Sequence, residues 1–92
     1  MKAFVLLANG TEEMEAVITC DILARAGIHV IRAAVNEDYK SNNLVLNCAN
    51  GMKVLADVRI QDAMSHMDDY AIIVLPGGSE GAQTFCSVNF VL

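Results

Sequence analysis

The apolar residues of this chain gather in short continuous runs separated by segments with helical spacing. Three runs stand out, at residues 3–8, 28–35 and 70–75. In residues 3–8 the hydrophobicity is continuous rather than alternating, which is typical of a strand covered on both faces. Between the first two runs, residues 11–26 have the spacing of a helix that ends before Gly27. This order of strand, helix and strand predicts a βαβ unit with a right-handed crossover.

The first helix should begin with Thr11 as its N-cap, because a hydroxyl group there can accept a backbone N–H bond. Glu12 and Glu13 suit the positive end of the helix dipole, and we interpret them as dipole and solubility residues. Asp21 and Arg25 lie four residues apart and can pair on the outer face. The helix carries two apolar stripes, formed by Ala16, Val17, Cys20, Leu23 and Ala24 and by Met14, Ile18 and Ile22. Two stripes predict two buried faces, one on a sheet and one on a further partner.

The remaining pattern completes a small α/β domain. An Asn-Gly pair at Asn50 is a strong hairpin signal. In chain order, the further expected elements are a polar loop at 36–43, hairpin strands at 44–48 and 52–55, a weak helix at 57–67, and a helix-compatible segment after the loop Pro76-Gly77-Gly78.

Composition narrows the class of protein. The 92 residues are 54% hydrophobic and 18% charged, which argues against disorder and fits one small domain over residues 1–92. A net charge of −5 with scattered basic residues disfavours nucleic acid as a partner. No run reaches the roughly 18 apolar residues of a membrane span, and the acidic Glu12-Glu13 argues against a signal peptide. Three separated cysteines without CxxC or zinc spacing predict a reducing cytoplasm and no metal site.

The loop after the third strand is a candidate binding site. Gly77 and Gly78 lie where α/β folds bind ligands, and their free N–H groups could hold an oxyanion. A plain strand-to-helix turn is the alternative, and the phosphate-loop lysine is missing. Glu15 should lie at the same sheet edge if the strands are parallel. It could exchange a proton or hydrogen-bond a thiolate there, or it could be an ordinary solvated glutamate.

The cysteines and histidines give weaker signals. Cys48 precedes the hairpin turn and is either a peripheral, oxidisable thiol or an inert buried one. Cys20 lies on an apolar stripe and is expected in the core, whereas Cys86 has no visible activating residue. Neither His29 nor His66 has an evident partner, so no nucleophile–base pair can be assigned from spacing.

Three motifs in order resemble the ThiJ/PfpI superfamily, and its bacterial ThiJ branch most. They are NGTEEMEAV after the first strand, NCANGMKVLAD around the hairpin, and DDYAIIVLPGGSEGAQTF around the diglycine loop. The resemblance covers nearly the whole chain, to about Phe85. It implies a flavodoxin-like three-layer α/β sandwich with a mainly parallel sheet, a homodimer and no cofactor. It also puts Met14 on the helix that relatives commonly place at the dimer interface.

The same resemblance implies a partial active site. Relatives carry a nucleophilic cysteine on a strand-to-helix elbow. The glutamate that matches Glu15 hydrogen-bonds this cysteine, and the glycines that match Gly77 and Gly78 supply N–H groups near it. Cys48 matches a peripheral cysteine. The elbow motif would lie beyond Leu92, and none of the three cysteines matches the nucleophile. We therefore expect this chain to be the N-terminal half of such a protein, truncated after the Pro-Gly-Gly loop.

The resemblance favours a cysteine-dependent stress-response enzyme that acts on small reactive aldehydes or glycated substrates, either glyoxalase-like or deglycase-like. The chain alone should be inactive. The alternative is a non-enzymatic, redox-responsive chaperone, and other branches of the superfamily suggest a peptidase or amidase. An unpaired edge at the strand over residues 71–75 predicts low solubility or self-association.

Overall fold

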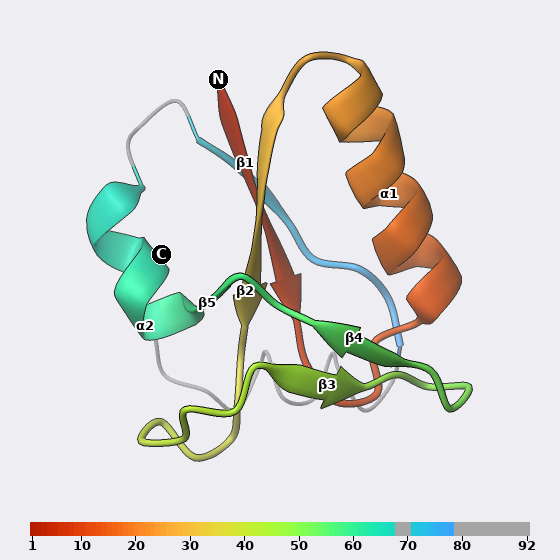
Figure 1. The fold of residues 1–92 in the computed structure, drawn as a ribbon, viewed down its shortest axis with the longest axis vertical. Helices are drawn as coiled ribbons and strands as arrows, with labels where there is room; N and C mark the ends of the chain where they lie inside the picture. Colours follow the sequence, from red (N-terminus) through yellow and green to blue (C-terminus); the bar gives the residue numbers. More distant parts are fainter. Residues whose placement is uncertain (68–70, 79–92) are drawn as a thin grey trace.

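The computed structural model describes residues 1–67 and 71–78, and Figure 1 shows a sheet with a helix on either side. In chain order the elements are β1 (Lys2–Leu7), α1 (Glu13–Arg25), β2 (His29–Ala34), β3 (Val45–Asn47), β4 (Lys53–Leu55), β5 (Val58–Arg59), α2 (Ile60–Ala63), the 3-10 helix η1 (Met64–His66) and β6 (Ile72–Val74). The prediction of an α/β fold with a mainly parallel sheet is confirmed. Tyr70 at the start of the expected third strand, the segment after Gly78 and Cys86 lie outside the described residues.

The larger sheet has the strand order β5-β2-β1-β6, and every neighbouring pair is parallel. β1 pairs with β2 along its whole length, and Leu7 lies opposite Ala34. On its other side β1 pairs with β6, where Val5 lies opposite Val74. Because parallel strands end at the same edge of a sheet, the turn after β1 and the loop after β6 are brought together.

The core lies on both faces of β1. Residues 3–8 are at most 2% exposed, as the continuous apolar run predicts. Phe4 and Leu6 belong to the cluster that packs against α2. Val5 and Leu7 belong to the cluster that packs against α1 and the hairpin. The helices therefore cover opposite faces of the sheet, which gives the expected three layers (Figure 1).

The start of α1 differs from the prediction. The N-cap is Glu12, whose carboxylate accepts from the backbone N–H groups of Met14 and Glu15 at 3.1 and 3.2 Å. Thr11 is fully buried, and its Oγ1 accepts from the N–H of Ala8 at 3.0 Å instead. The hydroxyl of Thr11 closes the turn back onto β1, so it is not available to cap the helix.

The described residues cover only part of one of the two apolar stripes of α1, because Val17 and Ala24 of the first stripe are exposed. Ala16 is buried, and Cys20 and Leu23 are half-buried against the sheet. The second stripe, Met14, Ile18 and Ile22, is between 49% and 65% exposed. Its expected partner remains a prediction. No helix in the described ranges is long and apolar enough to cross a membrane.

The hairpin prediction is confirmed. β3 and β4 pair antiparallel, with Val45 opposite Leu55, and the turn between them has Gly51 at φ +97°. The weak helix expected over 57–67 is divided into β5, α2 and η1. The two-residue strand β5 was not predicted from the sequence. Asp57, just before this strand, accepts from the backbone N–H and the guanidinium of Arg32, both at 2.9 Å.

Candidate functional site

Glu15 and the diglycine loop meet at the carboxyl ends of β1 and β6. The N–H of Gly77 donates to Oε1 of Glu15 at 3.4 Å, although 62 residues separate them in the chain. A Cβ atom at Gly77 would lie 2.8 Å from Oε2 of Glu15. The expected placement of both groups at one sheet edge is therefore confirmed. The Glu15 side chain is exposed and its bond to Gly77 is long, so both groups remain accessible to a further partner.

Backbone contacts fix the diglycine loop against the turn after β1. The N–H of Glu12 donates to the carbonyl oxygen of Gly77 at 2.8 Å. Gly78 has φ +121°, and a Cβ atom there would overlap the carbonyl oxygen of Gly10 and lie 2.9 Å from the nitrogen of Glu12. Only glycine accommodates this close backbone approach. The loop is thus held in one position relative to the first turn of α1.

Glu13 is a residue whose role the sequence analysis missed. It is 6% exposed rather than solvated, and its carboxylate accepts from the backbone N–H and side-chain Nδ2 of Asn50 and from the N–H of Met52. Its own backbone N–H and the bonds from Asn50 and Met52 lower its pKa, against the opposing effect of burial. Glu13 therefore joins α1 to the β3–β4 hairpin. The sequence around Glu13 gives no sign of this role, because its partner Asn50 lies 37 residues away in the chain.

The two described cysteines lack the features of a reactive thiolate. Cys48 is buried, and burial, followed by the charges of Glu13 and Glu12, raises its pKa. Cys20 is half-buried, and burial also raises its pKa. A raised pKa keeps a thiol protonated and poorly nucleophilic. For Cys48 this burial agrees with the inert alternative rather than with a peripheral oxidisable thiol.

The histidines lie away from Glu15. His29 and His66 line a cavity of about 480 Å³ together with Lys2 and Asp62. Lys2 and His29 begin β1 and β2, so this part of the cavity lies at the amino edge of the sheet, opposite the diglycine loop, and the cavity continues along β2 to Val58. Within residues 1–67 and 71–78, no three His, Cys, Asp or Glu side chains come together as a metal site.

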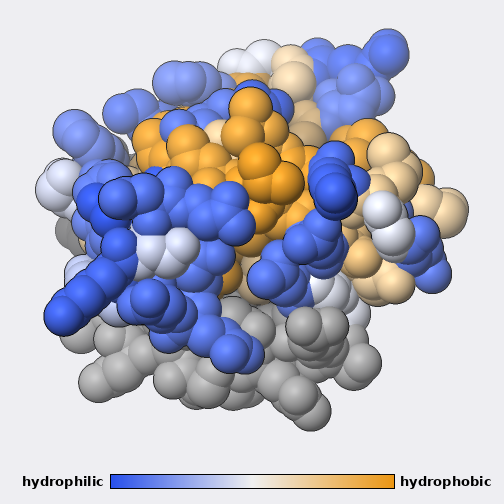
Figure 2. Space-filling model, turned by 60° about the horizontal axis from the view of Figure 1, so that its bottom comes forward, coloured by the Kyte–Doolittle hydropathy of each residue, from blue (hydrophilic) through white to orange (hydrophobic). Residues whose placement is uncertain are grey.

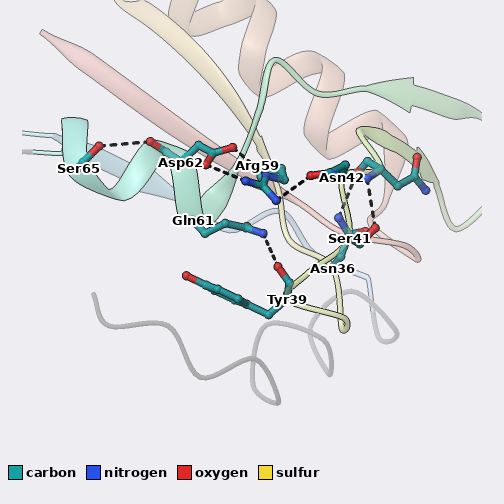
Figure 3. A network of polar contacts seen from close by, with 9 residues as sticks. Asn36, Tyr39, Ser41, Asn42, Arg59, Gln61, Asp62 and Ser65 are labelled. Carbon is teal, nitrogen blue, oxygen red and sulfur yellow. Dashed lines mark hydrogen bonds and ion pairs between the residues drawn. The ribbon is translucent and has the colours of Figure 1, made fainter.

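The loop over residues 36–43 also lies at the carboxyl edge, because it follows β2. Figure 3 shows how polar side chains attach it to α2. Arg59 pairs with both carboxylate oxygens of Asp62 and donates to Oδ1 of Asn42 at 2.8 Å. Gln61 donates to the carbonyl oxygen of Tyr39 at 2.6 Å. These contacts hold the loop against α2.

Apolar side chains reach the surface beside the site. Figure 2 views the molecule with the bottom of Figure 1 turned toward the reader. On this face it shows a hydrophobic area bordered by hydrophilic side chains. The large exposed apolar residues of α1 and the hairpin are Met14, Val17, Ile18, Ile22, Val45, Met52 and Leu55. Met14, Val17, Ile18 and Met52 line one groove between α1 and the hairpin. We call this the α1–hairpin groove.

Comparison with known proteins connects this geometry to one family. Residues 1–92 match the model of the DJ-1/PfpI family. Protein dj-1beta of Drosophila melanogaster is 38% identical over 97% of this chain, which spans 44% of that protein. The glutathione-independent glyoxalase DJR-1.2 of Caenorhabditis elegans is 34% identical over 83% of the chain, with 37% of that protein spanned. The crystal structure of Drosophila DJ-1beta superposes with a TM-score of 0.82 at 33% identity, covering 95% of this chain and 43% of that one. The chain thus spans about two fifths of the length of these relatives.

Proposed function

The chain belongs to the DJ-1/PfpI family, and from this membership we propose that Glu15, Gly77 and Gly78 form one wall of a site for small reactive carbonyl compounds. The reaction would be glyoxalase-like or deglycase-like. The C. elegans relative named a glutathione-independent glyoxalase supports this choice of chemistry. The observation that carries the proposal is the contact between the Gly77 N–H and the Glu15 carboxylate at the carboxyl edge of the sheet.

Each group has a role in this proposal. A cysteine thiolate adds to the aldehyde carbon, and the carbonyl oxygen becomes an oxyanion. The N–H groups of Gly77 and Gly78 donate to that oxyanion, which stabilises the charge as it develops. Glu15 hydrogen-bonds the thiol and moves the proton between sulfur and substrate. The rigid packing of Gly78 against Gly10 supports this role, because donors that are already in position need no reorganisation.

The thiolate itself would come from outside the described residues. Cys20 and Cys48 are both held as neutral thiols by burial. The family resemblance puts the nucleophile on an elbow that residues 1–92 do not contain. The 92-residue chain by itself is therefore expected to convert no methylglyoxal.

A chimera tests the proposed roles. The aligned segment of the C. elegans relative is replaced by the matching segment of this chain, and methylglyoxal conversion is measured by kcat/KM. We expect the chimera to be active and Glu15→Gln in it to lower kcat/KM at least about a hundredfold, the usual range for loss of a general acid–base. Asp21→Asn, a carboxylate change further along the same helix, is the matched control and should leave kcat/KM unchanged.

Two results would overturn the proposal. One is a chimera with native circular dichroism that converts no methylglyoxal. The other is equal kcat/KM for the Glu15→Gln chimera and its parent.

One observation favours a second, non-catalytic function. The exposed α1–hairpin groove offers apolar surface to a second copy or to an unfolded client protein. The buried position of Cys48 does not support a redox trigger at that thiol. A holdase function of this kind should suppress aggregation of a client equally well with Cys48→Ser, and lose this effect when Ile18 is replaced by aspartate.

A further inference from the structure

Asn50 lies at the point where the β3–β4 hairpin is attached to α1. Its side-chain Nδ2 donates to Oε1 of Glu13 at 2.9 Å, and its backbone N–H donates to both carboxylate oxygens of Glu13 at 3.0 Å. The N–H of Met52 adds a weaker bond to the same carboxylate at 3.3 Å. One asparagine therefore supplies most of the donors that satisfy a buried carboxylate.

Asn50 is followed by glycine, and so is one other asparagine of the described residues, Asn9. In an Asn-Gly pair the glycine nitrogen can attack the side-chain carbonyl carbon of the asparagine, because no side chain on the glycine obstructs the approach. The two pairs have the same local sequence chemistry but different surroundings. The chain thus contains an internal comparison for this reaction.

The structure distinguishes the two pairs. Gly10 is buried, its N–H donates to the carbonyl oxygen of Asn47 at 2.8 Å, and Oδ1 of Asn9 accepts from the N–H of Asn47 at 2.9 Å. Gly51 is exposed in the hairpin turn, and a Cβ atom there would meet nothing within 4 Å. Its N–H makes a longer bond, 3.2 Å, to the carbonyl oxygen of Cys48. The nucleophilic nitrogen is therefore held by a short bond in a buried position at Gly10, and by a longer bond in an exposed turn at Gly51.

We propose that Asn50 is a site of spontaneous deamidation, and that its conversion releases the β3–β4 hairpin from Glu13. The backbone nitrogen of Gly51 bonds to Cγ of Asn50, the bond from Cγ to Nδ2 breaks, and ammonia leaves with the amide proton. Water then opens the cyclic imide at either carbonyl group and gives aspartate or isoaspartate. The net change consumes one water and releases one ammonia, with no oxidant or reductant.

The aspartate product keeps the backbone N–H donors but loses the side-chain donor to Glu13. The donor Nδ2 is replaced by a carboxylate oxygen, so two like charges face each other across a hydrogen-bond distance. Isoaspartate also lengthens the backbone at this position, which displaces the N–H groups that donate to Glu13. The attachment lost is the one that shapes the α1–hairpin groove, because Glu13 and Met52 both line it.

The first test is the site selectivity. The 92-residue chain is incubated in mildly alkaline buffer, and deamidation is followed at each asparagine by peptide mass spectrometry and isoaspartate labelling. We expect Asn50 to convert at least about tenfold faster than Asn9, since a hydrogen-bonded, buried amide opens far more rarely. In concentrated denaturant the two rates should become similar. Equal rates in the folded chain, or faster conversion at Asn9, would overturn the proposal.

The second test is the release of the hairpin. Hydrogen exchange is measured on the deamidated chain and, independently, on Asn50→Asp. We expect the amides of residue 50 and Met52 to exchange at least about tenfold faster in both, with the amides of β1 unchanged. Asn9→Asp, at the other Asn-Gly pair, is the control and should leave the exchange of Met52 unchanged. Undiminished protection of Met52 in Asn50→Asp would refute the release step.

Discussion

Thr11, Glu12 and Glu13 follow one another in the chain, yet their side chains do three separate things. Thr11 closes the turn onto β1, Glu12 caps α1, and Glu13 is buried against the hairpin. The local sequence correctly predicts that a helix starts here, but it cannot tell which of the three side chains takes which role. The division depends on the hairpin, which lies far along the chain and approaches only in the folded state.

Gly78 should be the more sensitive of two glycines with positive φ. Gly78→Ala combines a backbone conformation that L-residues avoid with overlap on the Gly10 carbonyl, and should cost at least about 2 kcal/mol in the free energy of unfolding. Gly27→Ala, at φ +82° with open space around it, should cost only about 1 kcal/mol. Urea denaturation of both variants measures the difference. Equal costs would mean that the diglycine loop does not pack tightly on the turn after β1.

Glu13 should make the free energy of unfolding depend on pH in the acidic range. Its folded pKa lies below the ordinary value of 4.5, so its contribution is complete above that value and is lost as the pH falls through the folded pKa. Between neutral pH and about pH 3, the wild-type chain should therefore lose more stability than Glu13→Gln. Denaturant titrations at several pH values measure this. Glu37→Gln, in the exposed loop, is the control and should show the same dependence of stability on pH as the wild-type chain. If Glu13→Gln shows that dependence too, Glu13 is not the group responsible for the loss of stability in acid.

At the scale of elements, apolar runs and turn residues predict most of the structure. β1 and β6 lie in continuous apolar runs, β2 lies in an apolar run interrupted by His29 and Arg32, and the Asn-Gly pair marks the hairpin between β3 and β4. β5 could not be predicted, because two residues carry no periodicity. It exists because Val58 and Arg59 pair with Ala33 and Ala34 at the end of β2.

The attachment of β5 should depend on Asp57. Asp57→Ala removes the acceptor for the backbone N–H and guanidinium of Arg32, and should cost about 1 kcal/mol, because the pair is partly exposed. Asp21→Ala breaks the more exposed pair with Arg25 on α1 and should cost no more than about 0.5 kcal/mol. Thermal unfolding of the two variants separates these expectations. A smaller loss for Asp57→Ala than for Asp21→Ala would show that β5 is held in another way.

At the scale of the molecule, the meeting of Glu15 and Gly77 could be predicted because parallel strands share a carboxyl edge. The sequence could not predict that the stripe of Met14, Ile18 and Ile22 is exposed. The spacing of apolar residues shows that a helix face is apolar, but it does not show what covers that face. The proposed nucleophile likewise lies outside the described residues. Family resemblance, rather than spacing, supplies that part of the site.

The exposed α1–hairpin groove should drive self-association of the chain. Ile18→Asp puts a charge into this apolar groove and should weaken association at least about tenfold, because a buried unpaired charge opposes docking. Ser65→Asp, on η1 across the sheet, adds the same charge away from the groove. Sedimentation equilibrium measures both. If Ser65→Asp weakens association as much as Ile18→Asp does, net charge rather than the groove governs assembly.

The central position of β1 has a consequence for biosynthesis. β1 is synthesised before β6, whose first residue, Ile72, lies opposite Ala3 in the sheet. At about 5–20 residues per second, translation leaves this strand, which is apolar from Ala3 onward, without that partner for several seconds. During this interval the nascent chain presents an aggregation-prone segment that its own later residues cannot yet shield. Slowing translation between the two strands should therefore increase the demand for ribosome-associated chaperones.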